Sequence, residues 1–321
     1  MYTYTDVKNI IEKEIQQLHL PGYPAGLYDP VKYILSIGGK RFRPCLTLLS
    51  ANIFSDDISS VINPALAMEV FHNFTLMHDD IIDKAPIRRG KITVQEKWNI
   101  NTAILSGDVM LVKAYELLCT ADKNKLPAIL DVFNRTSKEV CEGQQMDTDF
   151  EKRENVAIDE YIEMIALKTS VLLGCCTYIG AITANADAAD AKCLYDFGKY
   201  LGISFQIQDD LLDAFGDETF GKKTGGDIAQ HKKTFLWITL QEKLNAEEKV
   251  YFKNKILHEA ENEKIKNVIA LYEKYKIKKI AEAAMKKYYE SSLAALEIVK
   301  AAGERKKVLH EIADAIYYRK F

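Results

Sequence analysis

Two stretches of the sequence decide how the chain folds: FHNFTLMHDDIID at residues 71–83 and QIQDDLLD at residues 206–213. Each places the spacing Asp-Asp-x-x-Asp in an apolar segment of helical character. On a helix, Asp79 and Asp83 lie one turn apart and share a face. An isolated copy of this spacing is usually a solvated helix face, but two copies in apolar surroundings are poorly explained in that way. We therefore expect two helices whose carboxylates have a specific task.

Outside these stretches the sequence also indicates helices. Its 321 residues include only seven prolines and sixteen glycines. Apolar residues recur at helical spacing, as in Leu194, Phe197 and Leu201, and the sequence offers few strand or hairpin signals. None of the breaks between helical segments is long enough for a domain linker. The sequence predicts an all-α fold in a single domain that spans residues 1–321.

Charge and cysteine usage favour a cytoplasmic protein without a nucleic-acid partner. The 43 basic and 46 acidic residues are spread along the chain, so no basic face is expected. The six cysteines form no Cys-x-x-Cys pair and no dense framework, which indicates reduced thiols. Charges at Glu12, Lys13 and Glu14 come too early for a signal peptide, and no charge-free apolar run of about 18 residues follows. We expect no membrane span.

The aspartates in both stretches favour a bound divalent cation. Carboxylates in an apolar helix are costly, because like charges repel and burial removes their solvation. Hard ions such as Mg²⁺ take carboxylate oxygens, keep several waters and bridge to substrate phosphates. If the two aspartate-bearing helices faced one another across a bundle, their carboxylates would form a metal cluster wide enough for a diphosphate.

Cationic residues near both stretches indicate a phosphorylated substrate. Arg88 and Arg89 follow the first stretch, and arginine suits bidentate contact with phosphate. A second cluster lies in GGKRFRP at residues 38–44. The third cluster, after the second aspartate segment, consists of Lys222, Lys223 and Lys232. Any one cluster could be ordinary surface charge, but together, beside paired aspartates, they favour phosphate binding.

With these motifs the sequence resembles the trans-prenyl (isoprenyl) diphosphate synthases, of the farnesyl or geranylgeranyl type, from about residue 38 to the C-terminus. The motifs, in order, are GGKRFRP at 38–44, the aspartates at 79–83 with Arg88-Arg89-Gly90, Gly107-Asp108, Gly143-Gln144, Lys168-Thr169, Phe205-Gln206 before the aspartates at 209–213, Gly221-Lys222 and Lys232. The resemblance implies the isoprenoid synthase helical bundle with a central substrate cavity. It also implies a homodimer and Mg²⁺ as cofactor, with three ions per active site.

The resemblance assigns roles to individual residues. The isopentenyl diphosphate site would comprise Lys40, Arg43, His72 and Arg89. The allylic diphosphate site would comprise Arg88, Lys168, Thr169, Gln206, Lys222 and Lys232, with Lys223 as an alternative to Lys222. The metal site would comprise Asp79, Asp80, Asp83, Asp209, Asp210 and Asp213. Within it, Asp79, Asp83 and Asp209 are expected to bind metal directly, and the other three to position waters and neighbouring groups.

The reaction that the resemblance implies is ionisation, condensation and elimination. Metal ions, Lys168 and Arg88 would stabilise the departing diphosphate, and the isopentenyl double bond would attack the allylic cation. A proton would then be lost to the released diphosphate, while Phe74 and other apolar residues exclude water. The residues expected to carry catalysis are Asp79, Asp83, Lys168, Gln206 and Asp209.

Product length is expected to depend on the helix that enters the first aspartate segment. Phe71, Phe74 and Thr75 lie on that helix, and the two rings could form the floor of the cavity. Asp80 and Asp83 are not separated by the two-residue insertion of the short-chain bacterial type. We expect a product of fifteen to twenty carbons, with a longer-chain polyprenyl diphosphate synthase as the alternative. Ordinary core phenylalanines would show the same spacing.

Three other functions fit the sequence less well. A class I terpene cyclase would normally have a mixed Asn/Ser/Glu motif in place of the second aspartate segment. A metal-dependent phosphohydrolase that used His78 and Asp79 would leave that segment unexplained. A non-catalytic partner subunit would typically lack some of the aspartates or cations. The role of the C-terminal Arg319 and Lys320 stays open between closing the isopentenyl site and forming a solvated tail.

Overall fold

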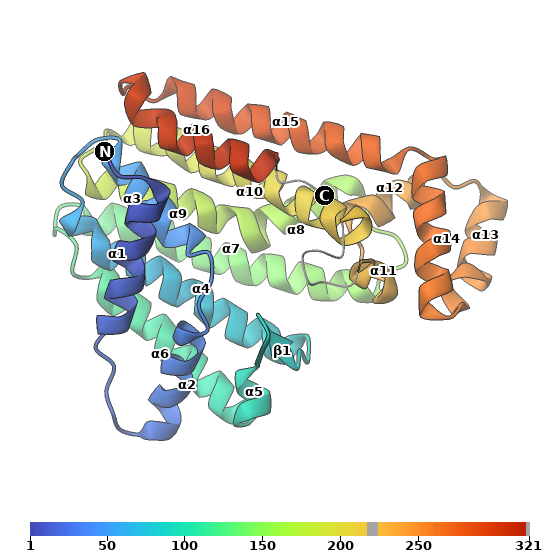
Figure 1. The fold of residues 1–321 in the computed structure, drawn as a ribbon, viewed down its shortest axis with the longest axis horizontal. Helices are drawn as coiled ribbons and strands as arrows, with labels where there is room; N and C mark the ends of the chain where they lie inside the picture. Colours follow the sequence, from blue (N-terminus) through green and yellow to red (C-terminus); the bar gives the residue numbers. More distant parts are fainter. Residues whose placement is uncertain (217–223, 319–321) are drawn as a thin grey trace. The chain divides into compact units, whose positions relative to one another are not determined.

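The computed structural model describes residues 1–216 and 224–318, and nearly all its elements are helices (Figure 1), as the sequence predicted. Lys222, Lys223, Arg319 and Lys320 lie outside the described residues. In chain order the elements are α1 (Tyr4–Gln17), α2 (Ala25–Ser36), α3 (Phe42–Asn52), η1 (Ser59–Val61), α4 (Ile62–Ile82), β1 (Ile87–Arg88), β2 (Lys91–Ile92), α5 (Val94–Lys97), α6 (Ile100–Leu118), α7 (Leu126–Lys152), α8 (Ile158–Ile165), η2 (Ala166–Ser170), α9 (Val171–Thr183), α10 (Ala188–Phe215), α11 (Gly226–Ala229), α12 (Phe235–Lys243), α13 (Ala246–Asn254), η4 (Ile256–His258), α14 (Glu261–Lys274), α15 (Ile277–Ile298) and α16 (Gly303–Tyr317).

A two-stranded antiparallel ribbon, β1 with β2, was not anticipated from the sequence. Ile87 pairs with Ile92, and Arg88 pairs with Lys91. The two residues between the strands, Arg89 (φ 51°) and Gly90 (φ 74°), both have a left-handed backbone. A hairpin turn with two such residues matches the natural twist of the strands. The ribbon therefore presents the arginine pair on a defined turn.

One compact unit comprises residues 1–134, 175–195 and 299–309. Within it α4 packs along α6, α2 and α3 pack against these helices, and α1 contacts α3 and α4. Buried apolar side chains such as Met68 and Met110 fill the core. A close approach of two helices requires Gly180 on α9, because a Cβ there would overlap the backbone carbonyl of Thr47 on α3.

The other unit comprises residues 135–174, residues 196–298 and the described part of 310–321. Ile207 and Leu211 of α10, Trp237 of α12 and Tyr272 of α14 belong to its buried core. Helices α12 and α14 both pack against α15. Because the apolar residues that flank the second aspartate segment are core residues, the position of that segment within this unit is fixed by packing.

The segment Ile158–Thr183 is long and apolar enough to cross a membrane by length and composition alone, but 72% of its most apolar window is buried inside the protein. Such burial is typical of a core helix. Within the segment, η2 is a five-residue π-helix. Insertions of this kind are frequent at functional sites, and η2 carries Lys168 and Thr169.

Candidate active site

The first aspartate segment lies at the end of α4. The helix ends there because Lys84 adopts a left-handed conformation, with φ 50°. The backbone N–H of Asp83 donates to the carbonyl oxygen of Asp79 (2.8 Å), and that of Ala85 donates to the carbonyl oxygen of Asp80 (2.9 Å). These bonds close the last turn and fix the backbone that carries the three carboxylates.

The three carboxylates of this segment have different surroundings. Asp80 is 2% exposed, and its Oδ1 lies 2.7 Å from Nε and 2.6 Å from Nη2 of Arg88. Burial raises the pKa of Asp80, and the Arg88 guanidinium counteracts that rise. Asp79 is partly buried, and Asp83 is exposed. Asp80 is therefore bound within the protein, whereas Asp83 is the most accessible of the three.

Arg43, near the start of α3, contacts His72 of α4, with 3.0 Å between Nη1 of the arginine and Nε2 of the histidine. Burial, followed by the charges of Arg43, Arg89 and Arg88, keeps the pKa of His72 well below its usual value. His72 is thus neutral near pH 7, and its Nε2 accepts a hydrogen bond. The Nε of Arg43 is buried and has no hydrogen-bond partner among the described residues. An anion with acceptor oxygens would satisfy this donor.

Lys40 and Arg89 belong to the same region of this unit. Lys40 is exposed in the loop before α3. Arg89 donates from Nη1 to the carbonyl oxygen of Gly38 in that loop. A Cβ at Gly39 (φ 154°) would overlap the Arg89 guanidinium, so this position requires glycine. The glycine pair of the loop therefore allows the hairpin arginine to reach it.

The second aspartate segment lies near the end of α10, in the other unit. Asp210 is 5% exposed and accepts hydrogen bonds from the Tyr161 hydroxyl (2.5 Å) and from the backbone N–H of Phe235 (2.9 Å). Burial raises the pKa of Asp210 to about 7, against the lowering effect of these hydrogen bonds. Asp210 therefore joins α10 to α8 and to the start of α12.

Asp213 fixes the segment that leads to Lys232. Its carboxylate accepts from the backbone N–H of Asp227 (3.0 Å), and its carbonyl oxygen accepts from that of Gly225 (2.7 Å). Nζ of Lys232 lies 3.7 Å from Oδ1 of Asp227. Asp209, by contrast, is partly exposed. Through these contacts the structure connects Lys232 to the second aspartate segment.

Lys168 is held by a contact between η2 and α7. Its Nζ lies 2.5 Å from Oδ2 of Asp147, and its side chain is 26% exposed. The close approach depends on Gly143, because a Cβ there would overlap the backbone of Lys168. The hydroxyl of Thr169 lies 3.4 Å from Oε1 of Gln206 on α10. The predicted residues Lys168, Thr169 and Gln206 are thus brought together in one unit.

Among the described residues, no three His, Cys, Asp or Glu side chains converge as a ready-made metal site. Mg²⁺ does not require one, because it usually keeps several waters and is bound by one or two carboxylates together with substrate phosphates. Asp79 and Asp83, one helical turn apart, and the partly exposed Asp209 provide the hard oxygen donors that Mg²⁺ prefers. The donor chemistry of the chain therefore fits the ion.

Three partners of site residues were missed in the sequence. They are Asp147, Tyr161 and Asp227. Each meets a partner on another element of the unit, at 21 residues for Asp147 with Lys168, 49 for Tyr161 with Asp210 and 14 for Asp227 with Asp213. Only Asp147 had a usable signal, because it lies one helical turn beyond the Gly143-Gln144 motif and shares a face with Gly143.

His78 has a packing role between α4 and α6. Its Nε2 lies 3.2 Å from the carbonyl oxygen of Ile104 and 3.9 Å from Oδ1 of Asp108. A Cβ at Gly107 would overlap the imidazole ring. The Gly107-Asp108 motif thus accommodates His78, which gives no support to a hydrolase centred on this histidine.

The residues predicted to set product length form part of an aromatic cluster. Phe71 is 1% exposed, with ring centroids 5.5 Å from Phe74 and 5.1 Å from Phe133. Phe74 is partly exposed and its ring lies 4.8 Å from that of His78. The Thr75 hydroxyl donates to a carbonyl oxygen of its own helix. Phe71 is therefore a core residue that supports Phe74.

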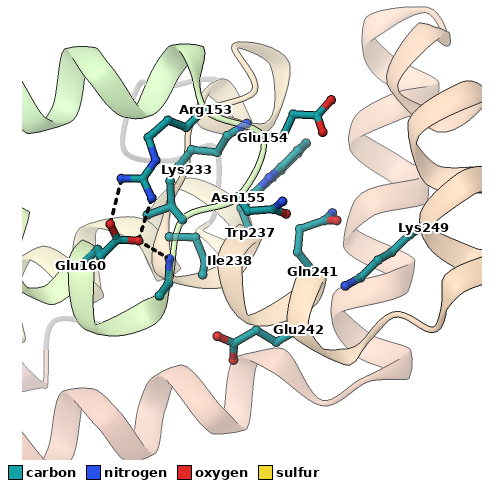
Figure 2. Close-up of a pocket in the computed structure, with 12 residues that line it drawn as sticks. Arg153, Glu154, Asn155, Glu160, Lys233, Trp237, Ile238, Gln241, Glu242 and Lys249 are labelled. Carbon is teal, nitrogen blue, oxygen red and sulfur yellow. Dashed lines mark hydrogen bonds and ion pairs between the residues drawn. The ribbon is translucent and has the colours of Figure 1, made fainter.

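A pocket of about 310 Å³ lies elsewhere in the second unit, between the α7–α8 turn, α12 and α13 (Figure 2). None of the predicted site residues lines it. Figure 2 shows the Arg153 guanidinium facing the Glu160 carboxylate, at 2.8 and 2.9 Å. The pocket therefore contains no residue that the sequence assigns to diphosphate binding.

The all-α fold, the two aspartate segments and the clustered cations define a trans-prenyltransferase of the isoprenoid synthase type. The chain belongs to the polyprenyl synthetase family, whose model matches residues 24–274. This membership confirms the resemblance found in the sequence and excludes the terpene cyclase and hydrolase alternatives.

Individual relatives agree with this assignment. The chain is 42% identical over 235 residues to the geranylgeranyl pyrophosphate synthase of Geoglobus acetivorans, which covers 73% of this chain and 74% of that protein. It is 39% identical over 236 residues to the geranylgeranyl diphosphate synthase of Methanosarcina mazei, with 73% of each chain covered. A crystal structure of a geranylgeranyl pyrophosphate synthase matches with a TM-score of 0.94 and 45% identity, over 100% of both chains.

Proposed function

We propose that this trans-prenyltransferase adds isopentenyl diphosphate to allylic diphosphates until the product has twenty carbons. The observation that carries the use of a second diphosphate substrate is the buried, unsatisfied Nε of Arg43 beside the neutral His72. With Lys40 and Arg89 in the same region, this donor suits a diphosphate that is bound in addition to the allylic one. A cyclase, which acts on one diphosphate, would have no use for it.

The side chains divide into two binding groups. Lys40, Arg43, His72 and Arg89 would bind isopentenyl diphosphate. Arg88, Lys168, Thr169, Gln206, Lys222 and Lys232 would bind the allylic diphosphate. Mg²⁺ held by Asp79, Asp83 and Asp209 would supply Lewis acidity at the leaving group. Asp80, Asp210 and Asp213, which accept hydrogen bonds from protein groups, would hold the surrounding segments in place.

Lys168 and the other allylic-site cations would stabilise the negative charge of the departing diphosphate. Phe74 would shield the allylic cation from water. The isopentenyl double bond attacks that cation, and the released diphosphate then accepts the proton. This sequence of steps needs no protein nucleophile.

The proposed length of twenty carbons rests on the aromatic cluster before Asp79. Phe71 is locked between Phe74 and Phe133, so the Phe74 ring has a rigid support. A ring held in this way would stop a growing chain better than a mobile side chain. The relatives named as geranylgeranyl synthases support the same length.

We further propose a homodimer formed through α6. Ile104, Leu105 and Val112 of that helix are 41%, 59% and 56% exposed. Large apolar side chains repeated along one helix in this way favour burial against a second copy of the chain. A cytoplasmic location is proposed as well, because the six cysteines form no Cys-x-x-Cys pair and no dense framework of the kind that small secreted proteins use.

The two compact units would act as one domain. Each is assembled from three separate segments of the chain, and α7, α9, α10 and α16 each contribute residues to both. Neither unit could therefore be released by a single cut in the chain.

The test is an elongation assay with purified protein, Mg²⁺, isopentenyl diphosphate and dimethylallyl, geranyl or farnesyl diphosphate as primer. We expect all three primers to end at twenty carbons. Phe74→Ala should give longer products, because it removes the proposed stop, while Phe252→Ala, a buried position in the other unit, serves as a control for general loosening. A wild-type product beyond twenty carbons, or an unchanged product from Phe74→Ala, would contradict the proposed length control.

A further inference from the structure

Helix α1 is attached to the loop that precedes α3. The Tyr4 hydroxyl donates to the carbonyl oxygen of Lys40 (2.5 Å). Oε1 of Glu12 lies 3.0 Å from Nε of Arg41. Val7 and Ile11 of the same helix are 0% exposed, so α1 is anchored by apolar packing independently of these two polar contacts. Two turns of one helix therefore reach two consecutive residues of the loop.

Arg41 is an unusual residue of this loop. Its backbone is left-handed (φ 52°), a conformation that residues other than glycine rarely adopt. Its side chain is only 1% exposed and makes an ion pair with the buried Glu69 (2.7 Å). It also donates to the carbonyl oxygen of Leu35 (2.7 Å). The Arg41 guanidinium thus bonds to groups within the protein. These bonds hold the loop in the left-handed conformation, which its backbone would not otherwise favour.

The conformation of Arg41 affects two cations that are close to it in the sequence. Lys40 precedes it and Arg43 follows two residues later, and both belong to the proposed isopentenyl diphosphate site. Any relaxation of the left-handed backbone at Arg41 would change the directions of these two cations relative to each other. The family match begins at residue 24, so α1 lies outside the segment that defines the family.

We propose that α1 is a positioning element for isopentenyl diphosphate: Tyr4 and Glu12 hold the Lys40–Arg43 loop in its binding conformation through Lys40 and Arg41. This inference rests on the proposed function, because it assumes that Lys40 and Arg43 bind that substrate. Neither Tyr4 nor Glu12 is a catalytic residue. Their effect should appear in the affinity for one of the two substrates.

The test compares wild type with the double variant Tyr4→Phe/Glu12→Gln, which removes the Tyr4 hydroxyl donor and the negative charge that pairs with Arg41 and keeps the apolar anchor. At saturating farnesyl diphosphate, we expect KM for isopentenyl diphosphate to rise about tenfold, with kcat and KM for farnesyl diphosphate within about twofold. Glu14→Gln is the matched control. It removes a charge on a different face of α1 and should leave all three constants unchanged.

The proposal is overturned if KM for isopentenyl diphosphate is unchanged, or if the KM values of both substrates rise together. If circular dichroism shows that the double variant is unfolded, the single variant Glu12→Gln is measured instead. It keeps the Arg41–Glu69 ion pair and is judged by the same criteria. Calorimetric titration with isopentenyl diphosphate gives a readout without turnover. Failure of the proposed function would show as no elongation by wild type, whereas failure of this inference would show as equal binding by wild type and variant.

Discussion

His72 illustrates how single residues of the site are tuned by their neighbours. It sits in contact with Arg43, and burial, followed by the charges of Arg43 and of further arginines, disfavours the charged form of its imidazole and so lowers its pKa. The neutral ring can accept a hydrogen bond and orient Arg43, which a charged ring would repel. The positive charge of the site is therefore concentrated on the guanidinium groups, where a diphosphate would use it.

The lowered pKa of His72 predicts a pH dependence of stability. Below its ordinary value of 6.5, the unfolded chain binds a proton that the folded chain does not, so the free energy of unfolding falls as the pH drops. Above that value both states are neutral and the effect disappears. At one pH unit below 6.5, a histidine that stays neutral in the folded protein would lower the free energy of unfolding by about 1 kcal/mol.

The variant His72→Gln keeps an acceptor for Arg43 but cannot titrate. When the pH is lowered from about 7.5 to about 5.5, we expect its free energy of unfolding to fall by about 1 kcal/mol less than that of wild type. Urea unfolding of both proteins at the two pH values, at one protein concentration, measures this difference. An equal loss in both proteins would show that His72 titrates normally in the folded state.

At the scale of elements, the π-helix η2 and α7 form a contact on which the site depends. Gly143 allows the backbone of η2 to approach, and Asp147, on the same face of α7, holds the Lys168 ammonium. A π-helix places Lys168 and Thr169 differently from a regular α-helix. The sequence motif around Gly143 is thus explained by a close approach of two helices.

We expect Gly143→Ala to lower stability by about 1–3 kcal/mol, because the added methyl group forces α7 and η2 apart. Elongation activity should fall as Lys168 is displaced. Gly26→Ala in α2, where a Cβ meets no heavy atom within 4 Å, is the control and should be neutral or slightly stabilising. Thermal unfolding and the elongation rate measure both effects, and wild-type values for Gly143→Ala would refute this role.

At the scale of the whole molecule, the exposed apolar side chains of α6 predict self-association. Complete burial of an apolar side chain of this size would stabilise the dimer by about 2 kcal/mol. Because a symmetric interface uses the same patch on both copies, each residue contributes twice. Leu105→Lys/Val112→Lys should therefore give a monomer at concentrations where wild type is a dimer. Val250→Lys on α13, at a position also 59% exposed, is the control. Sedimentation velocity measures the oligomeric state of all three proteins. A monomeric wild type or a dimeric double variant would contradict the proposed interface.

Much of this molecule could be predicted from the sequence because its signals are local. The helices follow from apolar periodicity, and both aspartate segments lie on helices as expected, although their position near the helix ends was not anticipated. The β1–β2 ribbon was missed because its strands have only two residues each. The partners Asp147, Tyr161 and Asp227 were missed because they depend on packing between distant segments. The sequence did not show that Arg41 is buried whereas its neighbour Lys40 is exposed, because both are cations in the same motif.

We propose that the carboxylates of both aspartate segments bind Mg²⁺ for a single elongation reaction. The most direct measurement is the rate of product formation from farnesyl and isopentenyl diphosphates as Mg²⁺ is titrated into metal-free protein. We compare wild type with Asp79→Asn and Asp209→Asn, which keep the size of the side chain and remove its charge. Wild type should be inactive without Mg²⁺ and regain activity with it, and each variant should lose a factor of about 100 or more. Activity of wild type without a divalent ion, or a variant of either segment with the wild-type rate and Mg²⁺ dependence, would contradict the claim.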